Sequence, residues 1–247
     1  MINILYKNYY METFKKPSFF ILAALFASTV ACAQTAEDIV KKSVDAIGGR
    51  DLLSSVKSVV IESDFDFNGN GGTSTTYILF GKGYKSETDF GGTKLIQCIT
   101  DKGGWTINPF MGQPTATALP EDLVKQSQGQ FKAGGPLVDY TANGGKIELV
   151  GKDTADYKIH FTNSAGADAI YFINMKTYYI DVVSSKMNMG GQSIDRVVRF
   201  SDYKKTDAGM VLPGQQAFDT PQGTATIVNK KIEVNKAIDP TIFDMPK

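Results

Sequence analysis

The chain has 247 residues with 26 basic and 26 acidic side chains, and 42% of its residues are hydrophobic. This balance includes no basic block of the kind that binds nucleic acid or an anionic membrane surface. One histidine and two cysteines are too few for the common zinc sites. Metal chemistry of that type and nucleic-acid binding are therefore excluded as leading functions.

Residues 1–33 have the three parts of a secretory signal in the usual order. A basic pair at 15–16 precedes an uncharged apolar run at 19–27, and Ala-Cys-Ala at 31–33 offers small residues for cleavage. The run is shorter than the roughly 20 apolar residues that a membrane-spanning helix needs. We expect residues 34–247 to be exported to the periplasm as one domain with a net charge of about −2, because three lysines and one glutamate precede them.

Two details of the signal matter for function. Met11 precedes a conventional short basic region, so we interpret residues 1–10 as a start-site artefact. Residues 29–32 (Thr-Val-Ala-Cys) form an imperfect lipobox, in which threonine replaces the usual leucine. Cleavage before Cys32 would give a lipid-anchored protein, and cleavage after Ala33 would give a free one, which we favour. Only Cys98 would remain in the free protein, so a disulfide framework is impossible.

The expected elements begin with a helix and continue as strands. Thr35 is the expected N-cap, Ile39, Val40, Val44 and Ile47 form one apolar stripe, and glycines 48–49 end the helix. A short helix is expected at 51–56. Alternating residues then predict a strand at 59–67 and, after a turn at 68–72, a partner at 75–80. Further strands are expected at 83–90, 94–100, 104–108, 146–151, 156–162, 168–174, 177–184, 194–203, 210–217, 223–229 and 230–235.

Residues 111–140 interrupt this series of strands. They contain Pro114, a helix expected at 121–127 after Pro120, and the turn 134–136. An interruption of this length indicates a lid or a cover for the core. Many twisted antiparallel strands cannot remain flat, so we expect a mainly β fold with some α structure. In this fold a curved antiparallel sheet makes a barrel or half-barrel, and an N-terminal helix and an inserted helix cover its concave face.

Catalytic groupings are weak in this sequence. His160 shares a strand face with Lys158, which predicts a solvent-facing residue without a nucleophile. Cys98 has apolar neighbours and is interpreted as a buried structural thiol. Asp64 and Asp66 have the spacing of paired carboxylates, but an exposed strand face explains them better. We expect a binding protein without a catalytic site, metal or cofactor, and a hydrolase with a carboxylate pair assembled by the fold is the third choice.

A large apolar and aromatic inventory on the strands is the stronger signal. A curled sheet of this many strands encloses more concave surface than two or three short helices can fill, which leaves room for an acyl chain. The residues expected at inward positions of this cavity are Ile61, Phe65, Tyr77, Leu79, Trp105, Ile107, Phe161, Phe172, Tyr178 and Ile180.

Three segments carry a resemblance to a known family. Residues 35–49 after the signal, the stretch 101–110 (Asp-Lys-Gly-Gly-Trp-Thr-Ile-Asn-Pro-Phe) and the closing residues 238–246 resemble LolA-like outer-membrane lipoprotein-sorting proteins of the LolA/LolB-like superfamily. The resemblance is strongest to versions from Bacteroidota-type bacteria, and it covers most of residues 34–247 as a pattern of strands.

The resemblance implies an unclosed β-barrel with a helical lid over a hydrophobic cavity. It implies a periplasmic carrier that takes up acylated lipoprotein or lipid and delivers it to an outer-membrane acceptor. We expect this carrier to be a monomer. Two departures limit the transfer. The best-known carriers are shorter, and they use an arginine that holds the lid closed, to which none of Arg50, Arg196 and Arg199 aligns. The alternatives are a lipid-anchored outer-membrane acceptor and a structural binding module.

Overall fold

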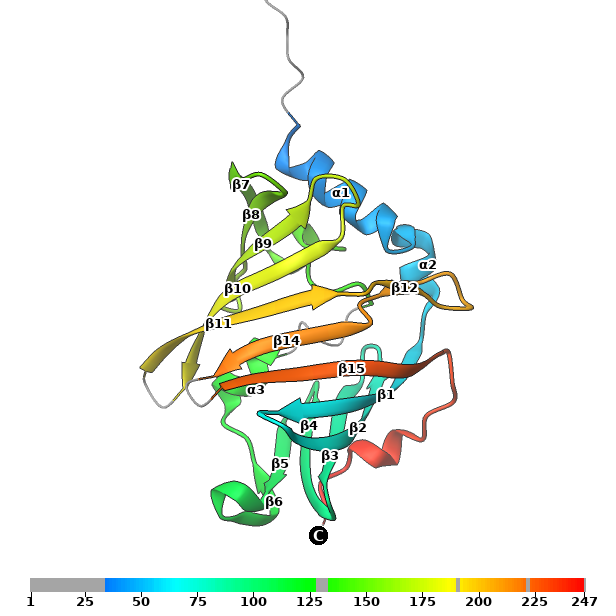
Figure 1. Ribbon diagram of the computed structural model, residues 1–247, viewed down its shortest axis with the longest axis vertical. Helices are drawn as coiled ribbons and strands as arrows, with labels where there is room; N and C mark the ends of the chain where they lie inside the picture. Colours follow the sequence, from blue (N-terminus) through cyan, green and yellow to red (C-terminus); the bar gives the residue numbers. More distant parts are fainter. Residues whose placement is uncertain (1–33, 128–132, 190–191, 221–222, 247) are drawn as a thin grey trace, which may run out of the picture. The chain divides into compact units, whose positions relative to one another are not determined.

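One antiparallel sheet of 13 strands dominates the computed structural model (Figure 1), which describes residues 34–127, 133–189, 192–220 and 223–246. The signal and the lipobox at Cys32 lie outside the described residues. The strand order is β6-β5-β4-β3-β2-β1-β15-β14-β11-β10-β9-β8-β7, and the sheet does not close into a barrel. Its two edge strands are therefore β6 and β7. A separate pair is formed by β12 and β13.

The strands are β1 (Ser58–Phe67), β2 (Asn70–Leu79), β3 (Gly83–Phe90), β4 (Thr93–Thr100), β5 (Gly104–Asn108), β6 (Gln113–Ala118), β7 (Lys146–Lys152), β8 (Asp156–Thr162), β9 (Asp168–Asn174), β10 (Ile180–Met189), β11 (Gln192–Ser201), β12 (Lys204–Lys205), β13 (Val211–Leu212), β14 (Gln215–Thr220) and β15 (Gly223–Val234).

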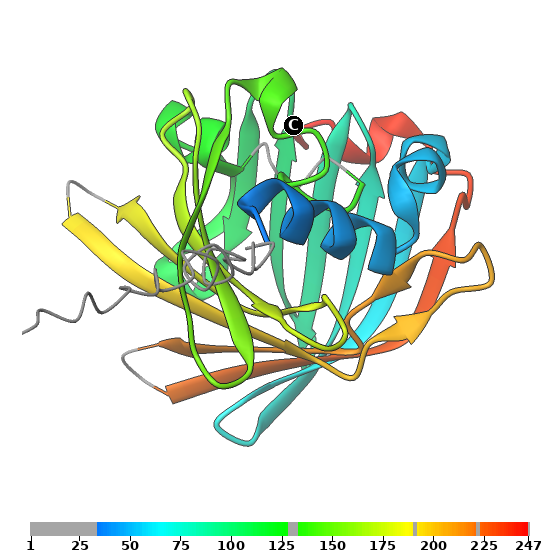
Figure 2. The same ribbon diagram turned by 90° about the horizontal axis from the view of Figure 1, so that it is seen from above.

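Helix α1 (Ala36–Ala46) lies on the concave side of the sheet (Figure 2). The expected N-cap is confirmed: the Thr35 hydroxyl accepts a hydrogen bond from the Asp38 amide at 3.1 Å, and the Asp38 carboxylate accepts one from the Thr35 amide. Ile39 and Val40 are buried against Ile159 of β8 and other core residues. The amphipathic stripe of α1 thus covers the half of the sheet that contains β8 and β9. The second helix is α2 (Gly49–Ser55).

The inserted segment adds a second cover. Helix α3 (Glu121–Ser127) has the bounds that the sequence predicts, and its Val124 packs with Ile99 of β4. Farther along, Leu137 and Val138 enter the core beneath α1. The mainly β fold, the unclosed curved sheet and the two helical covers of its concave face are therefore confirmed.

Several element boundaries differ from the expectation. Helix α2 begins at Gly49 rather than 51, β2 begins at Asn70 rather than 75, and the strand expected at 210–217 is two strands, β13 and β14, in different sheets. The interruption at 111–140 begins with strand β6, whose Pro114 is tolerated because β6 is an edge strand. The expected strands 223–229 and 230–235 are one strand, β15, with a bulge at Lys230, because Glu62 pairs with Lys231 and Ser63 pairs with Asn229. Strand β10 starts at Ile180 rather than 177, since the Asn174 side chain holds the residues before it in a turn.

A C-terminal segment covers part of the opposite, outer face of the sheet. The 3₁₀ helix η4 (Pro240–Phe243) packs Phe243 against Trp105 and Cys98. The Phe243 carbonyl accepts hydrogen bonds from Trp105 Nε1 at 3.0 Å and from the Cys98 thiol at 3.3 Å. Burial raises the pKa of the Cys98 thiol to about 12, and the thiol is fully buried. The interpretation of Cys98 as a buried thiol is confirmed.

Removing the Phe243 ring is expected to open a cavity in this outer cluster. We predict that Phe243→Ala lowers the free energy of unfolding of residues 34–247 by about 3 kcal/mol, measured by urea denaturation. The matched control is Met245→Ala two residues away, because the Met245 side chain is 46% exposed and its loss should change stability by less than about 0.5 kcal/mol. Equal effects of the two substitutions would contradict the assigned packing.

The burial of Cys98 predicts a thiol that is inert in the folded protein. In residues 34–247, Ellman's reagent at pH 8 should label Cys98 only after a denaturant is added. The unfolded thiol ionises near the ordinary pKa of 9.0, whereas the folded one ionises near 12. Its contribution to stability is therefore complete below pH 9 and is lost as the pH rises towards 12. Rapid labelling under native conditions would show that the C-terminal segment does not cover this site.

Candidate ligand-binding face

The strand register assigns side chains to the two faces of the sheet, because directly paired residues of antiparallel strands point to the same side. One paired row runs through Val59, Ile78, Tyr84 and Ile99. Val59 belongs to the core under α1, and Ile99 packs against α3. We call the side of this row the inner face. The neighbouring row Val60, Tyr77, Lys85, Cys98 and Trp105 lies on the outer face.

Five of the ten residues predicted for a cavity are on the inner side or at its rim. Ile61 and Ile180 pack partly buried against the core under α1, and Phe161 is buried within it. Phe65 follows Ile61 by four residues on β1 and so shares its face. Tyr178 lies in the turn before β10, where its hydroxyl accepts hydrogen bonds from the side chains of Gln34 and Lys42. Ligand contact by these residues stays a prediction.

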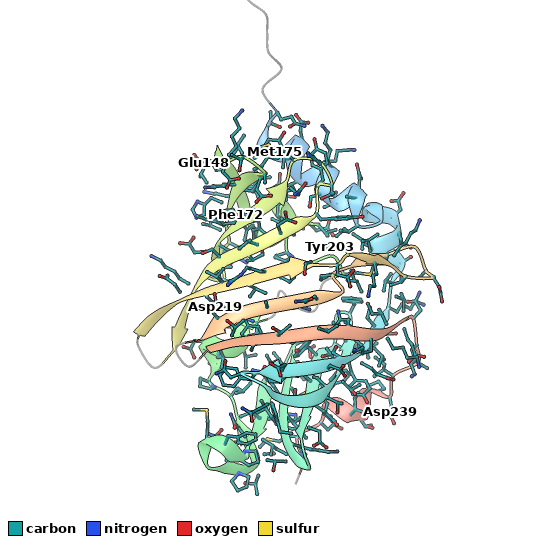
Figure 3. All side chains as sticks on the ribbon, viewed as in Figure 1. Glu148, Phe172, Met175, Tyr203, Asp219 and Asp239 are labelled. Atoms are coloured by element: carbon teal, nitrogen blue, oxygen red, sulfur yellow. The ribbon has the colours of Figure 1, made fainter. Side chains whose placement is uncertain are left out.

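The other five do not point inward, which corrects the expected single cavity lining. Tyr77, Leu79, Trp105 and Ile107 form the outer cluster beneath the C-terminal segment. Phe172, which is labelled in Figure 3, alternates with buried Tyr171 and Ile173 and so lies on the outer face. The Lys158 ammonium lies over its ring, 5.3 Å from the centroid. The physical reason is that the outer face of β2, β4 and β5 is also covered. Both faces of these strands are therefore apolar, and alternation alone does not tell them apart.

An aromatic cluster that the sequence reasoning missed extends the inner face towards the end of the β1–β2 hairpin. Phe65 and Phe90 face each other across Gly72, with ring centroids 5.2 Å apart in an edge-to-face arrangement. Phe110 of the 3₁₀ helix η1 (Pro109–Met111) continues the contact at 5.4 Å from Phe90. A side chain at position 72 would meet the Asp89 backbone and the Phe90 ring. In the sequence, the glycine at this position in a central strand was the available sign of the aromatic cluster.

The end of this cluster at Phe110 and Met111 is open to solvent. Phe110 is 63% exposed and Met111 is 77% exposed. The surrounding stretch 103–120 contains no charged residue. Adjacent exposed apolar side chains of this kind mark binding surfaces more often than isolated ones do. The inner face therefore ends at an apolar rim.

Between the core and the aromatic cluster, the inner face is polar. The Ser63 hydroxyl donates a hydrogen bond to Asn229 Oδ1 at 2.8 Å. In the neighbouring strands, Ser74 Oγ of β2 lies 3.1 Å from Thr88 Oγ1 of β3. The paired row beside them contains Thr76, Ser86, Gln97 and Thr106. We call these side chains, with Asn229, the hydroxyl band. Because its buried members bond to one another, the band crosses the apolar face without leaving those polar atoms unsatisfied.

Arg50 of α2 holds the inserted segment against the core. Its guanidinium donates to the Val138 carbonyl at 2.8 Å and lies 3.5 Å from an Asp139 carboxylate oxygen. Val138 in turn is buried under α1. The sequence did not assign a role to this arginine, because its partners lie far along the chain.

The residues considered for catalysis lie away from the inner face. His160 Nε2 is 2.8 Å from Asp168 Oδ1, an acid that the sequence reasoning did not identify, and the pair is on the outer face with Lys158. Asp64 forms an exposed ion pair with Lys230, and the Asp66 carboxylate accepts a hydrogen bond from the Gly69 amide. Among the described residues, no three His, Cys, Asp or Glu side chains are grouped as metal ligands. In the same part of the chain, no helix is long and apolar enough to cross a membrane.

Neither a protein-family model nor a curated protein matches the chain. Solved structures do resemble it. A LolA superfamily protein from Nitrosomonas europaea matches with a TM-score of 0.55 and 10% identity, covering 86% of this chain and 98% of its own. A putative outer membrane lipoprotein-sorting protein domain from Vibrio parahaemolyticus gives a TM-score of 0.51 and 11% identity, over 85% and 96%.

A DUF1329 family protein from Desulfovibrio piger is similar to the same extent. Its TM-score is 0.54 at 14% identity, and the match covers 83% of this chain and 97% of that one. At identities this low, the structural matches establish a common fold and nothing more. The activity has to be argued from the site. The chain thus has the LolA-like fold that its short sequence signatures indicate.

Proposed function

We propose that the protein is a periplasmic carrier that binds the acyl chains of lipoproteins or lipids on its inner face and delivers them to the outer membrane. The observation that carries the proposal is the aromatic cluster of Phe65, Phe90 and Phe110, which joins the concave face to an exposed apolar rim. The LolA-like fold supports the same reading.

An acyl chain suits this surface for energetic reasons. Each methylene that leaves water contributes about 0.8 kcal/mol, so a long chain needs an extended apolar surface more than it needs specific polar partners. The ring edges and faces of Phe65 and Phe90 supply such a surface, and Gly72 lets the two rings approach each other between strands. Binding without chemistry is also the simpler activity for a face whose nearest acid–histidine pair, His160 and Asp168, is on the other side of the sheet.

A pair of phenylalanine variants tests the assignment of the face. We predict that Phe65→Gln weakens binding of a fluorescent fatty acid by roughly tenfold or more, because one large apolar contact is lost. Phe172→Gln changes a phenylalanine on the outer face and should leave the affinity unchanged. Fluorescence titration of delipidated protein gives both dissociation constants, and thermal unfolding checks that each variant is folded. Absence of saturable binding to the unsubstituted protein would overturn the carrier proposal.

The second candidate is a lipid-anchored acceptor, and a structural observation bears on it. Gln34 is hydrogen-bonded through its side chain to the hydroxyls of Tyr157 and Tyr178, so the start of the domain is held against β8 and the turn before β10. A lipid on Cys32, two residues earlier, would therefore lie within roughly 7 Å of extended chain from the folded domain. An anchored form would be bound closely to its membrane rather than tethered on a long linker.

Metabolic labelling separates the free carrier from the anchored acceptor. Cells that express the full chain are grown with radioactive palmitate, and Cys32→Ser is the control. We expect no label in either protein and a mature N-terminus at Gln34, determined by mass spectrometry. Label that disappears in Cys32→Ser would instead establish the anchored acceptor.

A further inference from the structure

Arg196 of β11 lies on the inner face of the sheet. The inner-face positions of β11 are Arg196, Val198 and Phe200. Val198 shows this, because it pairs with Val183 of β10 and with Phe218 of β14. Phe218 belongs to the same paired row as Phe67 on the inner face of β1. In the described parts of β1–β5, β8–β11, β14 and β15, the strand register places no other Asp, Glu, Lys or Arg on this face. Arg196 is therefore the one charged side chain among these described inner positions.

The other two arginines of the domain have partners, and Arg196 has none among the described carboxylates. Arg50 pairs with Asp139, and Arg199, on the outer face of the same strand, pairs with Asp219. Arg196 is exposed, so its guanidinium is available to an incoming molecule. Burial raises the pKa of the Tyr84 hydroxyl in β3, and the positive charge of Arg196 opposes this rise. The charge therefore acts across the concave side of the sheet, between strands far apart in the sheet order.

The surroundings of Arg196 divide into a polar and an apolar part. Tyr84 is two residues before Ser86 on the same face of β3, and Ser86 pairs with Thr76 of the hydroxyl band. In the other direction, Val198 begins the apolar row through Phe218 and Ala225 to Phe67, next to the ring of Phe65. A positive charge and hydroxyl groups thus adjoin an apolar surface on one face, which is the pattern that an amphiphile with a single charged head group matches.

We propose that Arg196 binds the anionic head group of a single-chain amphiphile, a carboxylate or a phosphate monoester, while its acyl chain follows the row from Val198 to Phe65. The proposal rests on the carrier function and specifies its ligand. Arginine suits this role because its planar guanidinium donates two parallel hydrogen bonds to either oxyanion. An uncharged ester would find the same apolar row and would lose only the ionic contact.

The test compares acids with their neutral counterpart on delipidated protein. The probes are dansylundecanoic acid, its methyl ester and dodecyl phosphate, the last in competition with the acid. We expect the acid to bind roughly tenfold more tightly than the ester, and Arg196→Gln to remove this difference by weakening the acid alone. Competition by dodecyl phosphate shows whether the site accepts both oxyanions or the carboxylate only, and either result supports the proposal.

Two further variants keep the result specific. Arg199→Gln removes an arginine three residues away on the outer face and should change neither affinity. Arg196→Lys keeps the charge and should retain part of the preference for the acid. Equal binding of acid and ester to the unsubstituted protein, unaffected by Arg196→Gln, would overturn the head-group assignment and leave the carrier function standing. No binding of either probe would overturn both.

Discussion

Both faces of the half-sheet β1–β5 must be covered, and this constraint determines the rest of the structure. Its strands carry apolar side chains on either side: Ile99 points towards α3, and its neighbour Cys98 points towards η4. One insertion and one C-terminal segment therefore share the task of shielding a single sheet. Among the described residues, α1 packs on the core and α3 packs on Ile99. The remainder of the inner face, with Phe65, Phe90 and the exposed Phe110, is the candidate site.

The polar content of that remainder argues for selectivity. A face made only of phenylalanine and valine would accept any apolar guest, whereas the hydroxyl band and Arg196 would give a bound molecule a preferred direction. Ser63 and Asn229 are buried and bonded to each other, so the band is stable without a ligand. On the same face, the Arg196 guanidinium forms no ion pair with a described carboxylate, whereas Arg50 and Arg199 do. In the proposed complex, the affinity would come from apolar area and the orientation from one ionic contact.

Local patterns predicted much of the fold, and long-range pairing explains what they missed. The capping box at Thr35, the helix at Glu121–Ser127 and the strand Asp168–Asn174 follow from a few adjacent residues. The face of Trp105 depends instead on Phe243, 138 residues later, and period-2 alternation contains no information about that partner. For the same reason half of the predicted cavity residues were on the outer face, and Arg196 was not recognised as an inner residue.

The unclosed sheet also has a mechanical consequence. In a closed barrel, a change of diameter must stretch or break hydrogen bonds between strands. Here β6 and β7 are free edges, so small changes of twist at each strand pair add up without the loss of a single ladder bond. The curvature is set by the covers, through contacts such as Arg50 with Val138 and the α1 stripe with β8. In a carrier of the proposed kind, the inner face would thus be an adjustable surface whose width follows the thickness of the bound chain.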